Sequence, residues 1–338
     1  MQLFVLGLRR SGTTIVYDAL RADPALRCFY EPLREDDVTI GGGSGARQDD
    51  AFAETRAERE RFRTERYPEL HSELFNWGGP REPEVEIDSE LPDHVRDLLA
   101  HLLTTAPDVA IKETRLHHKL SALAEIAPDA AVVHLVRDPR AVTASMLLGR
   151  RRRTDVYPDA DTFFTARTGR KLWSSRRISE ALIERGSYTL PNDIPDFLRP
   201  LLVWHAAFES AHRDGARAFG DRYALVRLED LRSDPQGGFE RMYGLAGREV
   251  PAEVASWIGK NIRRQAKVRH RDDPRWAQAV RLLGMENAVR TAGYGEILEV
   301  DAADPQPLDL TPPPQRSRLA GFMGRARRRS LRANRAER

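Results

Sequence analysis

The chain has 338 residues, of which 41% are hydrophobic and 31% charged, and its formal net charge at pH 7 is +3. This charge is too small to indicate nucleic-acid binding by itself, and no apolar run approaches the roughly 18 residues of a membrane span. A single cysteine, Cys28, excludes an internal disulfide, and the first residues lack the basic and apolar regions of a signal peptide. We therefore expect a cytoplasmic protein without a nucleic-acid partner.

Taken in chain order, apolar runs of strand length alternate with segments whose apolar positions have helical spacing. The expected strands are residues 3–7, 27–31, 108–113, 130–138 and 223–230, and the expected helices are 13–22, 117–127, 139–152 and 197–219. Strands and helices alternate in this way when a parallel sheet carries helices on both faces. The sequence therefore predicts a single α/β domain with a parallel central sheet flanked by helices.

Two polar insertions and a tail fall outside this alternation. Residues 35–107 and 151–200 are long for connections in a compact domain, and we expect them to be partly helical or to face a substrate. A later segment, 233–247, begins with a helix-capping signal at Ser233. We expect a folded domain over residues 1–302.

The remaining residues, 303–338, are first proline-rich and then basic. We expect this tail to be disordered or partly helical, and a disordered, solubilising tail is the favoured interpretation. The alternative is a basic amphipathic segment over 316–338 that makes peripheral contact with an anionic membrane, where each arginine contributes about 1 kcal/mol.

The stretch "LGLRRSGTTIVYDAL" (6–20) has part of the pattern of a phosphate-binding loop. Gly7 and Gly12 have the spacing of that loop, but Thr13 stands where the loop has its lysine. The pattern alone is also compatible with an ordinary turn between a strand and a helix.

The position of this loop, between a strand and a helix, predicts an anion site. The backbone N–H groups of Ser11 to Thr14 would point toward an anion at the helix N-terminus, where the helix dipole favours negative charge. Arg10 can supply the positive charge that the missing lysine would have provided. The loop is therefore a candidate site for an anionic group other than an ordinary nucleoside triphosphate.

A second stretch, "HLVRDPRAVTASMLLGR" (134–150), ends a strand with Arg137 and places Ser145 eight residues later on the following helix. Together with "RSGTT" at 10–14, this pair resembles the sulfotransferases that use 3′-phosphoadenosine 5′-phosphosulfate (PAPS). The resemblance extends to about residue 246, includes "VRLEDL" at 226–231, and is nearest in motif to the carbohydrate and tyrosylprotein branches.

This resemblance implies a P-loop NTPase-like sulfotransferase fold, with PAPS as co-substrate and no metal. It implies that Arg137 and Ser145 bind the 3′-phosphate of the nucleotide. It also implies that the 5′-phosphosulfate end is bound by the loop residues Arg10, Ser11, Gly12, Thr13 and Thr14.

Two charged residues are candidates for catalysis. Glu31 follows the second expected strand, at the edge where ligands of open α/β sheets bind, and the resemblance to the tyrosylprotein branch implies that it is the general base. Lys112 ends the third expected strand and matches a family lysine that reaches the sulfuryl group and the bridging oxygen, which Arg10 would also stabilise. The alternative for Glu31 is a solvated loop carboxylate, and the alternative for Lys112 is a lysine that extends from the edge of the sheet into solvent.

The chain departs from the family at two positions. Thr114 stands where the small-molecule sulfotransferases have a catalytic histidine, and Leu228 stands where many members have a tyrosine. The departure at Thr114 leaves three weaker candidates for the base, which are Glu113, His117 and His118.

We therefore expect an enzyme that transfers a sulfuryl group from PAPS to a hydroxyl of a carbohydrate, lipid, natural product or peptide. A P-loop kinase or NTPase is the first alternative, and it would need a loop lysine and a metal-binding carboxylate, for which Asp138 is the nearest candidate. A catalytically inactive nucleotide-binding protein is the second alternative. No cluster of cysteine and histidine has metal-ligand spacing.

Overall fold

The computed structural model describes residues 1–34, 46–70, 83–149, 155–262 and 268–300, together with residues 308 and 310. The chain separates into two compact units, Met1–Leu308 and Asp309–Arg338. The boundary expected after residue 302 and the membrane contact considered for 316–338 fall outside the described residues and stay predictions. Of the described helices, none combines the length and the apolar character needed to cross a bilayer.

Five strands form one parallel sheet in the order β2-β3-β1-β4-β5. They are β1 (Gln2–Leu6), β2 (Arg27–Tyr30), β3 (Val109–Glu113), β4 (Ala131–Val136) and β5 (Tyr223–Arg227). In the central strand β1, Val5 lies opposite Lys112 of β3 and Val133 of β4. This arrangement confirms the predicted fold class, α/β with a parallel central sheet.

Helices follow the strands along the chain and occupy both insertions. The α-helices are α1 (Thr13–Leu20), α2 (Ala46–Arg66), α3 (Asp93–Thr104), α4 (Leu120–Ile126), α5 (Pro139–Leu148), α6 (Ala160–Thr165), α7 (Ser175–Glu184), α8 (Leu198–Phe219), α9 (Leu228–Ser233), α10 (Pro235–Gly244), α11 (Ala252–Asn261), α12 (Arg275–Leu282) and α13 (Glu286–Thr291). The 3₁₀ helices are η2 (Pro83–Ile87), η3 (Leu172–Ser174), η4 (Gly220–Arg222) and η5 (Gly295–Glu299).

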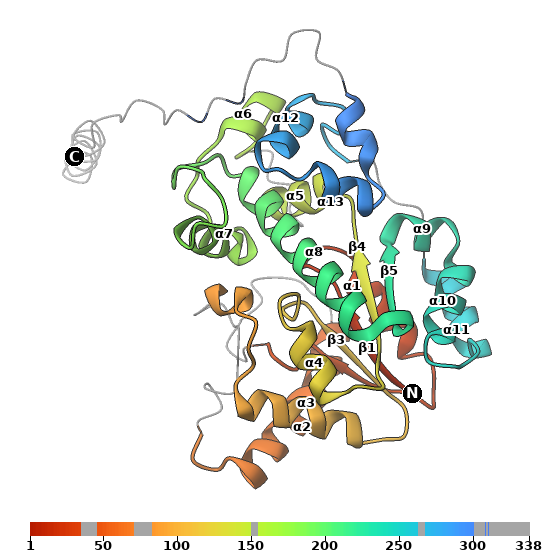
Figure 1. Ribbon diagram of the computed structural model, residues 1–338. Coiled ribbons are helices and arrows are strands. Elements are labelled where there is room, and N and C mark those ends of the chain that lie inside the picture. Colours follow the sequence, from red (N-terminus) through yellow and green to blue (C-terminus); the bar gives the residue numbers. More distant parts are fainter. Residues whose placement is uncertain are drawn as a thin grey trace, which may run out of the picture. The chain divides into compact units, whose positions relative to one another are not determined.

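The core lies on both faces of the sheet, because successive side chains of a strand point to opposite sides. Leu3 and Val5 of β1 belong to a buried cluster with side chains of α1, α10 and α11. Phe4 and Leu6 of the same strand belong to a second cluster with side chains of α3, α4 and α8. Figure 1 shows α8 running alongside β4, with α10 and α11 beyond β5. Burial on both faces explains why these strands are continuous apolar runs in the sequence.

The last strand is shorter than predicted. It ends at Arg227, and α9 starts at Leu228, whose side chain is buried. Glu229 and Asp230 lie in the first turn of α9, where negative charge stabilises the helix N-terminus. The apolar run of the strand therefore continues into a helix, which the acidic pair favours.

The cap of the next helix also differs from the prediction. The Asp234 carboxylate accepts the N–H of Gly237 at 3.0 Å, so Asp234 caps α10. The Ser233 hydroxyl donates instead to the carbonyl of Asp230, at the end of α9.

Gly7 lies where β1 passes into the loop and has little room around it. A β-carbon at this position would lie 2.6 Å from the carbonyl oxygen of Leu135 and 2.6 Å from Cγ2 of Thr13. We expect Gly7→Ala to lower the free energy of unfolding by about 1–3 kcal/mol, as overpacking usually does. Gly259→Ala in α11 is the control, since nothing lies within 4 Å of its β-carbon and alanine is the better helix former. Urea unfolding measures both variants, and equal stabilities would contradict the close approach at Gly7.

Candidate active site

The loop between β1 and α1 turns at two residues in the left-handed region. Arg10 has φ 77° and Gly12 has φ 94°, and Gly12 directly precedes the first turn of α1. A β-carbon on Gly12 would also lie 2.8 Å from both methyl carbons of Leu228, so this position requires glycine for two reasons. The first N–H groups of α1, at Thr13 and Thr14, have no preceding helical carbonyl to bond, which suits this end of the helix to an anion.

Ser11 contributes to the loop through its hydroxyl. Its backbone N–H donates to the carbonyl of Leu8 at 2.9 Å, so this N–H is not available to an anion. The hydroxyl oxygen is buried and has no hydrogen-bond partner among the described residues. The Thr14 hydroxyl lies 3.3 Å from the phenol oxygen of Tyr30, which connects the loop to the end of β2.

Arg10, Arg137 and Ser145 come together from distant parts of the chain. The Nε of Arg10 donates to the Oγ of Ser145 at 2.8 Å, and Nη1 of Arg137 donates to the carbonyl oxygen of Arg10 at 2.9 Å. Burial lowers the pKa of the Arg137 guanidinium, and the positive charges of Arg232 and Arg10 lower it further, while Glu229 opposes them. Positive charge that is crowded in this way favours the binding of an anion.

Lys112 and Glu31 meet at the carboxyl ends of β3 and β2. The Lys112 ammonium donates to Oε1 of Glu31 in a close ion pair and lies 4.2 Å from the centre of the Tyr30 ring. The N–H of Glu31 donates to the carbonyl of Lys112 at 2.7 Å, and Glu31 has φ 45°. Lys112 is only 2% exposed. Residue 112 therefore holds both the main chain and the carboxylate of Glu31.

Charges on both partners set the ionisation of this pair. Burial raises the pKa of the Glu31 carboxyl, but the positive charges of Lys112 and Arg115 and the hydrogen bond from Lys112 outweigh burial and hold the pKa below its ordinary value of 4.5. Burial lowers the pKa of the Lys112 ammonium, but the negative charge of Glu31 outweighs burial and leaves it raised. Both groups are charged at neutral pH, so Glu31 can accept a proton.

The lowered pKa of Glu31 predicts how the pair contributes to stability as the pH changes. A carboxyl whose pKa is lower in the folded state stabilises the fold above its unfolded pKa, near 4.5, and this contribution is lost as the pH falls through the folded pKa. We expect the difference in unfolding free energy between the wild type and Glu31→Gln to be constant from pH 7 to about pH 5 and to shrink below that. Urea unfolding across this range measures it, and a difference that grows in acid would contradict the ion pair.

Glu113, one of the weaker candidates for the base, has a structural role. It is fully buried, and its carboxylate accepts the N–H of Leu33 at 3.1 Å and the N–H of Thr114 at 2.6 Å. Burial is the main cause that raises the pKa of its carboxyl, and the negative charge of Glu31 adds to the effect. Because Leu33 lies two residues after Glu31, Glu113 fixes the turn that presents Glu31.

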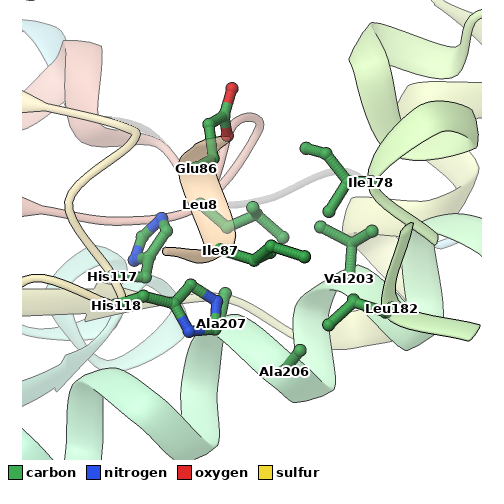
Figure 2. A pocket seen from close by; sticks show the side chains of 10 residues that line it. All are labelled: Leu8, Glu86, Ile87, His117, His118, Ile178, Leu182, Val203, Ala206 and Ala207. Atoms are coloured by element: carbon green, nitrogen blue, oxygen red, sulfur yellow. The ribbon is translucent and has the colours of Figure 1, made fainter. Parts of the chain in front are cut away.

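His117 and His118, the other weaker candidates, face a small pocket between η2, α7 and α8 (Figure 2). The pocket is mostly apolar, with Glu86 as a further polar side chain in its lining. Its volume of about 10 Å³ holds roughly one water molecule, and His117 is 4% exposed. Burial lowers the pKa of His117, and it lowers the pKa of His118 to about 4. The pocket is too small for an acceptor molecule.

Asp138, the nearest candidate for a metal-binding carboxylate, is held by Arg140. Its two oxygens accept Nε of Arg140 at 3.0 Å and Nη2 at 2.8 Å, and it also accepts the Arg140 N–H at 2.8 Å as the cap of α5. Arg140 donates in addition to Glu296 at 2.7 Å. Across the part of the chain that the structure describes, no group of three histidine, cysteine, aspartate or glutamate residues could hold a metal ion.

One further group of contacts at the site has no signal in the local sequence. The Tyr294 hydroxyl donates to Glu229 at 2.7 Å, and the other oxygen of Glu229 accepts the N–H of Asp138 at 3.2 Å. Arg227 lies over the Tyr294 ring, 4.6 Å from its centroid. Leu228, at the position where many sulfotransferases have tyrosine, is buried against Gly12. Tyr294 is 65 residues from Glu229, so only the fold brings the two together.

The sequence of this chain is similar to a known protein family over its first half. Residues 2–155 match the family model described as "Sulfotransferase family". No curated protein sequence matches the chain.

Solved structures that are similar to this chain include three bacterial sulfotransferases. Sulfotransferase STF9 from Mycobacterium avium is 16% identical, with a TM-score of 0.46 over 90% of this chain and 78% of that chain. Sulfotransferase STF1 from Mycobacterium tuberculosis H37Rv is 17% identical, with a TM-score of 0.40 over 77% and 70%. A sulfotransferase from Alicyclobacillus acidocaldarius is 12% identical, with a TM-score of 0.39 over 89% and 97%. The family match itself spans β1 to α5, where the candidate site lies, so this part of the chain resembles the sulfotransferase family.

Proposed function

We propose that the protein transfers a sulfuryl group from PAPS to the hydroxyl group of an acceptor. The observation that carries this proposal is the contact between two anion-binding elements, the loop 10–14 and the pair of Arg137 and Ser145. A donor with a phosphosulfate at its 5′ end and a phosphate at its 3′ end would use both elements. The match to the sulfotransferase family supports the same reaction class.

The loop would bind the 5′ end of the donor. The N–H groups at the start of α1 and the unpartnered hydroxyl of Ser11 supply donors, and Arg10 supplies positive charge. A transferring sulfuryl group carries less charge than a phosphoryl group, so these groups can stabilise it without a metal ion. The proposal therefore includes PAPS as co-substrate and no metal.

Arg137 and Ser145 would bind the 3′-phosphate. Because Nε of Arg10 donates to Ser145, a single guanidinium would have to serve both ends of the nucleotide. We infer that Arg10 exchanges Ser145 for the phosphosulfate end when the donor binds, which frees the Ser145 hydroxyl for the 3′-phosphate.

Glu31 and Lys112 would carry the chemical step. Glu31 accepts the proton of the acceptor hydroxyl while the acceptor oxygen bonds to the sulfur. The bond between sulfur and the bridging oxygen breaks, and Lys112 and Arg10 stabilise the negative charge left on the 5′-phosphate. Since the Lys112 charge lowers the pKa of Glu31, an anion that draws Lys112 away makes Glu31 a stronger base.

The acceptor in this proposal is a small molecule, a glycan or a lipid that carries a hydroxyl, and peptide hydroxyls have the same chemistry. The two insertions, 35–107 and 151–200, would shape its pocket. The proposed location is the cytoplasm, and no nucleic-acid partner is part of the proposal.

Mass spectrometry of a cell extract tests the reaction. The extract is incubated with PAPS and the full chain, and products are searched for the mass of an added sulfuryl group. We expect such a product with the wild type and none with Arg137→Ala at limiting donor. A product that carries a phosphoryl group from ATP, or no sulfated product from extracts of several sources, would contradict the proposal.

A further inference from the structure

Trp173 is an exposed aromatic residue beside the phosphate-binding loop. It is 45% exposed, and with Leu282 it is one of the two large hydrophobic side chains that the described residues expose. The guanidinium of Arg10 lies over its ring, 5.4 Å from the centroid. Single exposed apolar residues are common on protein surfaces, so its importance depends on where it lies and how it is held.

The backbone that carries Trp173 has an unusual conformation. Leu172, Trp173 and Ser174 have φ of 48°, 56° and 73°, a region that residues with a β-carbon rarely occupy and hardly ever in succession. Arg170 holds the segment to the end of α5 by donating to the carbonyl of Leu147 at 2.8 Å. Backbone strain of this kind collects at functional sites, where surrounding contacts maintain it.

Arg9 connects Trp173 to the other insertion. Its Nε donates to the carbonyl of Trp173 at 3.1 Å, and its Nη1 donates to the carboxylate of Glu86 at 2.7 Å. Glu86 belongs to η2 in the insertion 35–107, and Trp173 belongs to the insertion 151–200. The two insertions proposed to shape the acceptor pocket are therefore joined through Arg9, the residue next to Arg10.

We propose that Trp173 forms a wall of the acceptor subsite, and that the acceptor presents its hydroxyl on a ring whose flat face packs on the indole. This inference rests on the proposed sulfuryl transfer and deepens it. Arg10, the proposed ligand of the phosphosulfate end, lies against the same indole, so a ring on Trp173 is next to the transferring group. Phenols and sugars share this chemistry, because both combine a flat apolar ring face with a hydroxyl at its edge.

Binding of small probes to the full chain tests this proposal. The probes are 4-nitrophenol and methyl β-glucopyranoside as rings, and 1-pentanol as an open-chain alcohol. Saturation-transfer NMR titrations give their affinities in the presence of saturating adenosine 3′,5′-bisphosphate, whose own affinity is first measured by calorimetry for every variant. The variants are Trp173→Ala, Trp173→Gly and Trp173→Phe, with Leu282→Ala as the control for loss of an exposed apolar side chain.

We expect at least one ring probe to bind the wild type more tightly than 1-pentanol, and we expect Trp173→Ala to weaken it by about tenfold. Trp173→Phe should bind it within about threefold of the wild type, and Leu282→Ala should not change it. Trp173→Gly tolerates the positive φ, so it should lose the ring probe while its melting temperature stays at or above that of the wild type. The better of the two ring probes identifies the kind of ring.

Three results would overturn the assignment. The first is equal affinity of the ring probes for the wild type and Trp173→Ala, and the second is no preference for rings over 1-pentanol. The third is a loss confined to the bisphosphate, which would place Trp173 against the nucleotide. Failure of the wild type to bind the bisphosphate would instead contradict the proposed donor, and the ring probes are then titrated without nucleotide.

Discussion

Replacing Glu31 by glutamine is expected to lower kcat by about 10²–10⁴-fold, the usual effect of removing a general base. Glutamine keeps the size of the side chain and an oxygen that can accept a hydrogen bond from Lys112, but it cannot take the proton of the acceptor. The affinity for adenosine 3′,5′-bisphosphate should change little, because Glu31 contacts Lys112 and lies outside the loop 10–14. Steady-state assays that follow release of the bisphosphate from PAPS measure kcat, and calorimetry measures the affinity.

Glu58→Gln is the matched control for the loss of a buried, paired carboxylate. Glu58 lies on α2, outside the candidate site, and is 6% exposed. It forms ion pairs with Arg27 of β2 and Arg61 of α2. We expect this variant to keep kcat within about threefold of the wild type, since it touches none of the proposed catalytic groups. Wild-type turnover by Glu31→Gln would show that another residue is the base, and His117 and His118 would then be tested.

The second large effect is expected for Lys112→Met, which should lower kcat by about 10²–10³-fold. Methionine keeps much of the buried volume but cannot stabilise the charge that develops on the leaving oxygen. The same change leaves Glu31 as a buried carboxylate without its partner, so the free energy of unfolding should fall by about 3–5 kcal/mol. Both effects are measurable in one preparation, by steady-state kinetics below the melting temperature and by urea unfolding.

A double variant separates the catalytic effect from the structural one. Lys112→Met combined with Glu31→Gln leaves no unpaired charge, so it should recover most of the lost stability. Its kcat should remain at least as low as that of Lys112→Met. Recovery of turnover together with stability would mean that Lys112 acts only by supporting the fold.

Much of the fold could be predicted from the sequence because the strands are buried on both faces. Val132 and Val133, for example, belong to opposite core layers of β4, so the strand is a continuous apolar run that stands out from its surroundings. The boundary after Arg227 was harder to predict, because Leu228 continues the apolar pattern although its buried side chain already belongs to a helix. A local apolar pattern does not distinguish a residue that continues a strand from a residue that begins a buried helix.

The candidate site was predictable only as separate motifs. The loop 10–14 and the pair of Arg137 and Ser145 are visible in the sequence because each has a fixed local spacing. The contact between Arg10 and Ser145 spans 135 residues and follows from the adjacency of β1 and β4 in the sheet. The role of Glu113 could not be predicted, since it depends on the N–H of Leu33, which is 80 residues away.

The conformation of Trp173 was even less predictable from the local sequence. Nothing in "RKLWSS" indicates three successive residues with positive φ, because none of them is glycine. Trp173 contacts Arg9 and Arg10, which lie more than 160 residues earlier in the chain. Such strained positions are where reasoning from local preference is expected to fail, and they coincide with functional sites often enough to be tested first.

Calorimetric titration of the full chain with adenosine 3′,5′-bisphosphate, AMP and ATP, each with and without Mg²⁺, tests the donor assignment most directly. We predict that the bisphosphate binds without Mg²⁺ and at least about tenfold more tightly than AMP or ATP, since charge-assisted hydrogen bonds contribute about 1.5–3 kcal/mol each and about 1.4 kcal/mol is tenfold in affinity. Arg137→Ala should remove this preference for the 3′-phosphate. Tightest binding by ATP in a Mg²⁺-dependent manner would contradict a PAPS-dependent sulfotransferase and favour a kinase or NTPase.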